Sequence, residues 1–273
     1  MSNSTNMSDA SNYLEKNKDS WNRRTDYHVD SEFYDVKGFL AGNTSLKSVE
    51  LKLLGDIRNK SILHLQCHFG QDTLSLARMG AEATGVDLSD NAIKNAYLLA
   101  EKAKLKAEFI CCDVYSLLQH LDKQFDIVFT SYGTIGWLPD LDKWAKVVSR
   151  YLKPGGKFVF VDFHPVVWMF DNNFEKVGYN YFNVAPIIEM ESGTYADKNA
   201  PINKEYVGWN HPASEVLNSL IQNGLSLASY DEFDYSPYNC FNHTEEFEPG
   251  KFRIKHLGNK IPMLFALVAQ KEK

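Results

Sequence analysis

The feature that most constrains this chain is the segment 61–77, SILHLQCHFGQDTLSLA, which predicts a short buried strand, a tight loop and the start of a helix. A second predicted strand ends at Gly85-Val86-Asp87, so that Asp87 follows Gly70 by seventeen residues. Doubly wound α/β proteins hold adenosine-type ligands with such a helix-opening turn and an acid at the tip of the next strand. The loop brings backbone N–H groups to the ligand, and the acid accepts hydrogen bonds from a ribose diol.

Strand and helix patterns alternate from residue 61 to residue 162. Short apolar runs predict strands at 62–65, 83–86, 107–111, 125–130 and 157–161. Such runs are expected when helices cover both faces of a parallel sheet. Helical patterns lie between them at 73–79, 89–104, 114–121 and 142–152. The alternation predicts a doubly wound α/β fold with a mostly parallel, Rossmann-like sheet.

The flanking segments follow other patterns. Leucines at 46–54 predict a short helix on the sheet, whereas the polar and aromatic residues upstream show no clear period. The aromatic-rich segment 163–209 is too long for an ordinary connection, which predicts an inserted lid with its own structure. A helix at 213–222 and strands at 225–230 and 261–269 follow, with a loop between 235 and 258. The predicted division is an N-terminal extension and cap (1–45), a cofactor-binding core (46–163), an inserted lid (164–211) and a completion of the core sheet (212–273).

Composition limits the class of protein. The 273 residues carry a net charge of −6, which argues against a dedicated DNA-binding protein. No apolar run is long enough to span a bilayer, and residues 1–12 are polar, so no membrane partner and a cytoplasmic location are expected. The cysteines at 67, 111, 112 and 240 form no CxxC pair, so neither a metal site nor a disulfide framework is expected. The oligomeric state stays open.

The residues at the strand ends resemble the motifs of class I S-adenosylmethionine-dependent methyltransferases, over roughly residues 45–163 and more loosely 212–270. The second, third and fourth motifs correspond to Gly85-Val86-Asp87-Leu88-Ser89, Cys112-Asp113-Val114 and residues 125–132. The first motif of that family is an acid followed by Gly-x-Gly-x-Gly. Here the aligned residues are His64, Gln66, His68 and Gly70, so only the last glycine is kept. This form of the first motif is similar to that of a bacterial subgroup of the family.

The resemblance implies S-adenosylmethionine as methyl donor and S-adenosylhomocysteine as product. It implies that Asp87 accepts hydrogen bonds from the ribose and that Asp113 partners the adenine amine. Leu88 and Val114 would then lie on either side of the purine. A structural explanation is open for each residue. Each acid could instead stabilise the N-terminus of the following helix through the helix dipole, and each apolar residue could simply belong to the core.

The departures in the first motif need a physical account, because this cofactor has no phosphate for a glycine loop to approach. Its loop must cradle a zwitterionic aminobutyrate tail, which the side chains of Gln66 and His68 are placed to bind. Asp72 or His64 is expected to partner the ammonium. Gly70, Ser131 and Cys67 complete the candidate cofactor set, although Cys67 is better explained as a small apolar residue packed under the loop. The alternative is that the departures abolish cofactor binding.

Candidate residues for chemistry and acceptor binding lie outside the loop. His164 follows the fifth strand and is a candidate general base because an imidazole titrates near neutrality, and Tyr132 at the end of the fourth strand is placed to reach the substrate. An N-terminal segment folded over the cofactor would bring Arg24 to its carboxylate. The candidate substrate-binding residues are Trp21, Arg24, His28, Tyr34 and, in the aromatic stretch, Trp168. A structural role is an open alternative for each.

These inferences predict an enzyme that transfers a methyl group from S-adenosylmethionine to a small molecule, with an aromatic lid suited to an apolar or ring-containing acceptor. Two alternatives stay open. An NAD-dependent oxidoreductase would share the first turn and Asp87, although Gln66 and His68 would crowd its pyrophosphate. A non-catalytic ligand-binding protein could keep the fold with an altered first motif.

Overall fold

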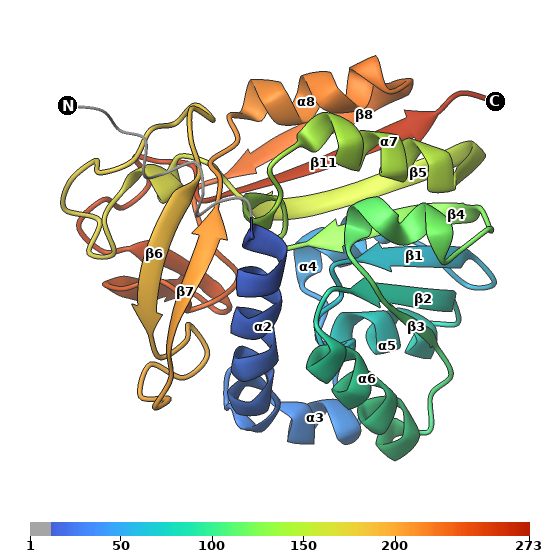
Figure 1. Ribbon diagram of the computed structural model, residues 1–273, viewed down its shortest axis with the longest axis horizontal. Coiled ribbons are helices and arrows are strands. Elements are labelled where there is room, and N and C mark those ends of the chain that lie inside the picture. Colours follow the sequence, from blue (N-terminus) through green and yellow to red (C-terminus); the bar gives the residue numbers. More distant parts are fainter. Residues whose placement is uncertain (1–11) are drawn as a thin grey trace.

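A seven-stranded sheet forms the centre of the protein, for which a computed structural model describes residues 12–273 (Figure 1). The strand order is β3-β2-β1-β4-β5-β11-β8. The first five strands in the chain run parallel, whereas β11 is antiparallel to β5 and β8. Their bounds are β1 Ser61–Leu65, β2 Glu82–Asp87, β3 Glu108–Cys111, β4 Phe125–Ser131, β5 Leu152–Phe163, β8 Leu225–Phe233 and β11 Leu264–Lys271. The predicted fold class, a doubly wound and mostly parallel sheet, is confirmed.

Helices cover both faces of the central part of this sheet, which explains why its central strands are largely apolar. Ile62 of β1 packs with residues of α4 (Ser48–Leu54) and α5 (Gln71–Arg78). Leu63 and Leu65 point to the opposite face and pack with α7 (Leu141–Tyr151) and α8 (Ala213–Gln222). Successive side chains of a strand point to opposite faces, so a strand covered on both sides must be apolar at every position. The remaining core helix, α6 (Asp90–Ala103), lies beside α5.

Two predicted boundaries in the core need correction. The segment predicted as a helix at 114–121 is a 3₁₀-helix, η1 (Val114–Gln119). Strand β5 begins at Leu152, where α7 ends, so the turn that contains Gly155 at φ +77° is part of an irregular first stretch of the strand.

The N-terminal segment forms a long helix where the sequence showed no clear period. Helix α2 spans Tyr13–Asp30 and is followed by the short α3 (Val36–Leu40). The buried side chains of α2 are spaced three to four residues apart, as in any amphipathic helix, but they are polar. They are Asn17, Ser20, Arg24, Thr25 and His28. A search for apolar periodicity therefore misses this helix.

The segment after β5 contains short elements outside the central sheet. The insertion (residues 164–211) contains η3 (Val167–Met169) and an antiparallel pair, β6 (Ile187–Ser192) and β7 (Asn203–Gly208). In Figure 1 it lies to the left of α2, and the core lies to the right. Helix α2 contacts both β7 and α6, so it joins the two parts. The predicted four-part division of the chain stays a prediction.

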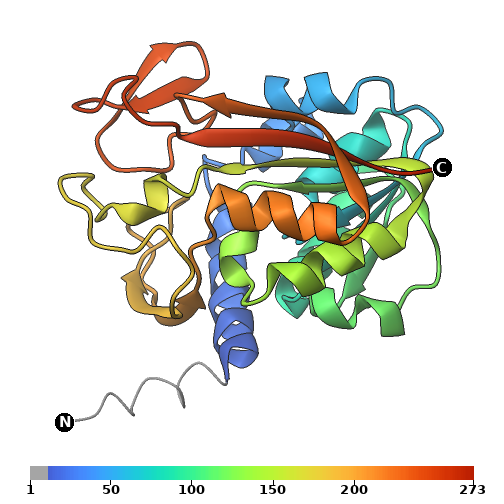
Figure 2. The same ribbon diagram turned by 90° about the horizontal axis from the view of Figure 1, so that it is seen from above.

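The connection between β8 and β11 is not the loop that was predicted. It contains a second antiparallel pair, β9 (Thr244–Glu248) and β10 (Lys251–Ile254). Figure 2 shows this pair at the end of the molecule that also carries the insertion. The acidic run Glu245-Glu246 in β9 lacks the apolar alternation that would have indicated a strand. None of the helices in residues 12–273 is long and apolar enough to cross a membrane.

Candidate functional site

One large cavity lies at the carboxyl ends of the parallel strands, between α2 and the insertion. Its volume is about 780 Å³, within the range of small-molecule sites. Residues at the ends of β1, β2, β3 and β4 line it, as expected for a doubly wound sheet. Most of the predicted site residues line this cavity: Trp21, Arg24, Tyr34, His64, Gln66, Cys67, His68, Asp72, Asp87, Leu88, Asp113, Val114, Ser131, Tyr132 and Trp168. No cluster of three or more His, Cys, Asp or Glu suited to a metal ion occurs among the described residues.

The loop after β1 has the backbone of a glycine loop, although only one glycine is present. Gln66, His68 and Gly70 have φ values of +55°, +51° and +75°. The left-handed region costs a non-glycine residue roughly 1–2 kcal/mol. Two side chains therefore occupy strained positions at the cavity wall, where such strain often accompanies function.

Gly70 has a packing role and does not line the cavity, and its assignment to the cofactor stays a prediction. A Cβ atom at this position would lie 2.5 Å from the ring of Phe109 and 2.9 Å from Ala96. Gly70 therefore allows the start of α5 to approach β3 and α6 closely. Cys67 is also mainly a packing residue, because it is buried and its Sγ lies under Gly85, although part of it lines the cavity.

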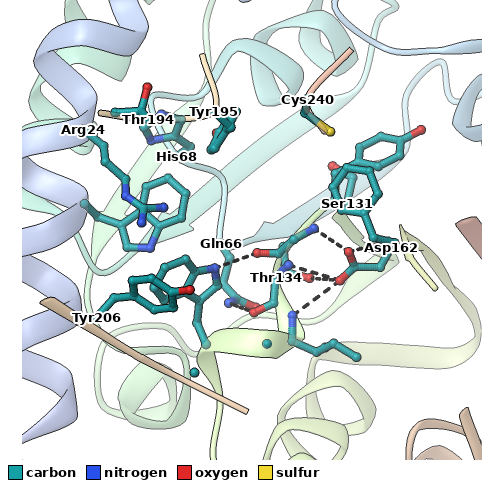
Figure 3. A pocket seen from close by; sticks show the side chains of 18 of the residues that line it. Arg24, Gln66, His68, Ser131, Thr134, Asp162, Thr194, Tyr195, Tyr206 and Cys240 are labelled. Carbon is teal, nitrogen blue, oxygen red and sulfur yellow. Dashed lines mark hydrogen bonds between the residues drawn. The ribbon is translucent and has the colours of Figure 1, made fainter. Parts of the chain in front are cut away.

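The side chain of Gln66 is held by the loop after β4. Its Nε2 donates a hydrogen bond of 2.8 Å to the carbonyl oxygen of Thr134. That loop is held in turn by Asp162 at the end of β5, as Figure 3 shows. The Asp162 carboxylate accepts hydrogen bonds from the backbone N–H of Gly133 and, at 3.1 Å, from both the N–H and the hydroxyl of Thr134.

Asp162 was not among the predicted site residues. It is 2% exposed and lines the cavity. Burial raises the pKa of its carboxyl group, whereas the backbone N–H donors oppose that rise. Its position as an acid at the tip of a parallel strand was the signal that could have identified it.

The tips of β2 and β3 form one end of the cavity, with Asp87, Leu88, Asp113 and Val114 in its wall. The Asp87 carboxylate accepts hydrogen bonds from the backbone N–H of His68 (2.7 Å) and of Ser89 (2.9 Å). It retains lone pairs for further donors, because a carboxylate accepts about four hydrogen bonds. Burial raises the pKa of Asp87 to about 6. Burial likewise raises the pKa of Asp113.

His64 occupies the position of the acid in the first motif, and it is neutral. Its Nδ1 lies 2.8 Å from the Thr73 hydroxyl, and burial lowers the pKa of the imidazole to about 3. Asp72, in the first turn of α5, is the nearby group that can carry negative charge. The Ser131 hydroxyl donates to it at 3.4 Å, and burial raises the pKa of its carboxyl group.

Helix α2 forms a long wall of the cavity. Arg24 is 4% exposed and pairs with Glu191 of β6. Its guanidinium lies 5.0 Å from the ring centres of both Trp21 and Trp137. His28 lies behind this wall and does not line the cavity, so its contact with substrate stays a prediction. Its Nδ1 is instead 2.9 Å from Nε2 of His68.

Aromatic side chains line the other end of the cavity, beyond the tips of β4 and β5. The ring centre of Tyr132 lies 4.9 Å from that of Tyr238 and 5.8 Å from that of Phe163. Phe163 also contacts Phe241 and Trp168. These rings come from β4, β5, the insertion and the segment before β9. Tyr34 adjoins them from the N-terminal side through Phe33, whose ring contacts those of both Tyr34 and Tyr238.

The two predicted catalytic side chains are not placed to act as bases. His164 does not line the cavity, and its Nε2 lies 2.8 Å from Oε1 of Glu232 on β8. Burial lowers the pKa of His164, so its position is that of a structural histidine. Tyr132 does line the cavity, but its hydroxyl donates to Glu50 at 2.6 Å. Burial holds the pKa of Tyr132 well above its usual value, so it stays protonated.

Comparison with known proteins finds similarity to methyltransferases. A model of the methyltransferase domain matches residues 63–160. A ubiquinone biosynthesis O-methyltransferase of Coxiella burnetii is 29% identical over 198 residues, which are 70% of this chain and 74% of that protein. These matches support a class I S-adenosylmethionine-dependent methyltransferase. The match to the same enzyme of Idiomarina loihiensis is 32% identical but spans 37% of this chain and only 41% of the relative.

Solved structures of methyltransferases share the fold of this chain. An S-adenosylmethionine-dependent methyltransferase of Mesorhizobium loti has a TM-score of 0.56 at 18% identity, over 85% of this chain and 100% of that one. One of Clostridium acetobutylicum has a TM-score of 0.57 at 15% identity, over 94% and 99% of the two chains. At these identities the likeness concerns the fold. The predicted family and its cofactor, S-adenosylmethionine, are confirmed, whereas the residue roles within the site stay predictions.

Proposed function

We propose that this methyltransferase transfers the methyl group of S-adenosylmethionine to a small, largely apolar molecule that contains a ring. One observation carries the proposal. A single cavity has carboxylates at strand tips at one end and a group of aromatic rings at the other. The first end suits a nucleoside, and the second suits a planar or apolar acceptor.

The residues present fit the cofactor. Asp87 offers acceptors for a ribose diol, and Asp113, between Leu88 and Val114, offers one for the adenine amine. Asp72 supplies a negative charge for the ammonium in place of the acid that the first motif lacks. When bound, the cofactor supplies a methyl group that its sulfonium already activates.

The protein then has to position the acceptor and exclude water. Well-oriented reactants can lower the barrier by about 7–11 kcal/mol. The aromatic end can position the acceptor and exclude water, because the rings of Tyr132, Phe163 and Tyr238 come from different parts of the chain and pack together. Their arrangement favours an acceptor whose flat face stacks while its nucleophilic atom points to the tip of β4.

The relatives suggest the kind of acceptor atom. The curated relatives of Coxiella burnetii and Idiomarina loihiensis are named for O-methylation in ubiquinone biosynthesis, and another, of Caenorhabditis elegans, is named as a sterol 4-C-methyltransferase. A ring-bearing acceptor is common to these names and to the aromatic end of the cavity. We therefore propose a ring hydroxyl oxygen as the first candidate for the atom that accepts the methyl group.

Titration calorimetry with S-adenosylhomocysteine tests the cofactor end, and we expect a dissociation constant in the micromolar range (~8 kcal/mol). Transfer of a labelled methyl group to a panel of phenols, catechols and quinols tests the acceptor end, with aliphatic amines and peptides as the contrasting panel. Transfer only to the contrasting panel would refute the ring-bearing acceptor and leave the cofactor site intact.

The NAD-dependent alternative finds little support in the cavity. A pyrophosphate needs close approach of backbone N–H groups, which glycines permit. The side chains of Gln66 and His68 occupy the corresponding positions. Protein fluorescence titrated with NAD should therefore show no saturable change.

A further inference from the structure

One face of strand β6, in the insertion, forms part of the cavity wall. Every second side chain of a strand points to the same side, and Ile187, Glu189 and Glu191 of β6 all line the cavity. Tyr206 of β7, which is paired with Glu189 in the ladder, lines it as well. This wall therefore carries two carboxylates, and they differ in their partners.

Two cations balance the charge of Glu191. Its Oε2 forms ion pairs with Arg24 and, at 3.3 Å, with Nζ of Lys204. Both cationic side chains are buried, with 4% and 1% of their surface exposed. Glu191 therefore joins α2 to the insertion and carries no unbalanced charge.

Glu189 differs, because no cation of the described residues is paired with it and its donors are two phenol hydroxyls. Tyr179 donates to Oε1, and Tyr206 donates to Oε2 at 2.7 Å. The carboxylate raises the pKa of Tyr179 to about 12, and burial together with the carboxylate raises the pKa of Tyr206, so both hydroxyls stay protonated. A carboxylate accepts about four hydrogen bonds, so Glu189 has capacity for further donors from the cavity.

Tyr206 connects Glu189 to the tip of β4. Its ring packs against that of Trp137, with 5.4 Å between the ring centres. The indole N–H of Trp137 donates to the carbonyl of Gly133 at 2.8 Å, in the loop that follows β4. Figure 3 shows Tyr206 on the opposite side of the view from Ser131, the last residue of β4. The carboxylate is therefore held across the cavity from the strand tip at which the acceptor atom is expected.

Tyr179 connects Glu189 to the aromatic end of the cavity. Its backbone N–H donates to the carbonyl of Met169 at 3.0 Å. The neighbouring Trp168 contacts Phe163 of the aromatic group, with 5.8 Å between the ring centres. The two tyrosines thus anchor one carboxylate to both parts of the wall that surround the proposed acceptor.

Methylation of a ring hydroxyl leaves one proton to be removed. An electron pair of the acceptor oxygen forms the new bond to the methyl carbon, and the pair of the broken carbon–sulfur bond stays on the sulfur. The oxygen would be left with a positive charge unless its proton passes to a base. His164 lies outside the cavity, Tyr132 stays protonated, and Asp162 is already occupied by donors from the loop after β4.

We infer that Glu189 is the general base of this reaction, which accepts a hydrogen bond from the acceptor hydroxyl and takes its proton as the new bond forms. The inference rests on the proposed function and narrows the acceptor to a ring that carries a hydroxyl group. Tyr179 and Tyr206 are positioning residues, because they act by holding the carboxylate. The insertion then supplies a catalytic residue as well as a cover for the cavity.

Two acceptors that differ in ionisation test the base. One is the phenol of the acceptor panel that reacts fastest, and the other is its nitro-substituted analogue, assayed at a pH at which its hydroxyl is already ionised. Glu189→Gln keeps the size of the side chain and removes its basicity. We expect it to lower kcat for the protonated phenol about a hundredfold or more, as is typical for loss of a general base, and for the ionised analogue less than about fivefold.

Glu205→Gln is the matched control. Glu205 of β7 is paired with Met190 in the ladder, so it lies on the face of the β6–β7 sheet opposite to Glu189, and it does not line the cavity. The same loss of charge at this position should change kcat for either acceptor less than about twofold. Glu189→Asp keeps a carboxylate and should recover at least about tenfold of the rate that Glu189→Gln loses with the protonated phenol.

The outcomes separate this role from structural damage and from the proposed function. If Glu189→Gln lowers the rates with both acceptors by the same factor, the base is refuted and the methyltransferase remains. If the wild-type protein methylates no ring hydroxyl, the proposed function fails and the inference fails with it. Circular dichroism, and an affinity for S-adenosylhomocysteine within about twofold of wild type by calorimetry, establish that each variant is folded.

Discussion

Burial raises the pKa of two acids in or near the cavity wall, Asp87 and Glu50. Asp87 keeps two backbone donors, and its pKa is nevertheless raised to about 6. Glu50 of α4 is fully buried, and burial raises its pKa to about 7 even though Tyr132 and the backbone N–H of Lys47 donate to it. These two carboxyl groups therefore titrate close to physiological pH.

Asp87 gives the first prediction. A ribose diol donates to the ionised carboxylate, so binding favours ionisation and protonation opposes binding. We expect the dissociation constant of S-adenosylhomocysteine to be flat above about pH 7 and to rise up to about tenfold per pH unit below about pH 6. Calorimetry across pH 5–8 measures this. Asp87→Asn should bind more weakly and lose the acidic limb, and a limb retained in that variant would exclude Asp87 as its source.

Glu50 gives a prediction about stability. Its folded-state pKa lies above the unfolded value, so the folded protein loses stability as the pH rises from about 4.5 to about 7. Glu50→Gln removes this term. The unfolding free energy of the variant, relative to that of the wild type, should therefore rise between pH 5 and pH 8 by up to about 3 kcal/mol. Urea denaturation at several pH values measures this. A difference that does not change with pH would show that Glu50 carries no such penalty.

Among the elements, α2 is the one whose contacts the sequence conceals. Asn17 substitutes for a neighbouring strand, because its amide donates to the carbonyl of Val207 at 2.8 Å and accepts from the N–H of the same residue at 2.9 Å. The side chain of Asn17 is 2% exposed. Through this pair the helix holds the edge of β7.

Replacing Asn17 by Ala should leave both backbone groups of Val207 unsatisfied. We expect a loss of about 1–3 kcal/mol in unfolding free energy, measured by urea denaturation. Arg23→Ala, on the exposed side of the same helix, is the control and should cost a few tenths of a kcal/mol. Equal effects of the two substitutions would mean that the link to β7 contributes nothing.

The sequence predicted the elements whose signals are local. Strand tips such as Asp87, Asp113 and Ser131 follow from apolar runs and their ends, and the structure brings them to one cavity. The buried face of α2 is polar, so apolar periodicity in the sequence could not reveal this helix or its buried side. The aromatic end depends on contacts between residues far apart, such as Tyr132 with Tyr238. The sequence could not place the side chain of His164, because its direction beyond the strand end depends on its partner, Glu232.

For the whole molecule, ligand binding should appear as stability. A ligand that binds only the folded state at 100 times its dissociation constant adds about 2.7 kcal/mol. For a chain of this size we expect S-adenosylhomocysteine to raise the melting temperature by roughly 5–10 °C in differential scanning fluorimetry. NAD should leave the melting temperature unchanged, and a rise with NAD alone would favour the dehydrogenase alternative.

The position of β11 has a consequence for how the protein is made. Residues 264–271 lie between β5 and β8, in the interior of the sheet. During synthesis, β5 and β8 leave the ribosome first and expose two unpaired hydrogen-bonding edges, which are prone to join other chains. Chaperone binding or rapid folding would therefore have to protect these edges until β11 is made and pairs with both strands.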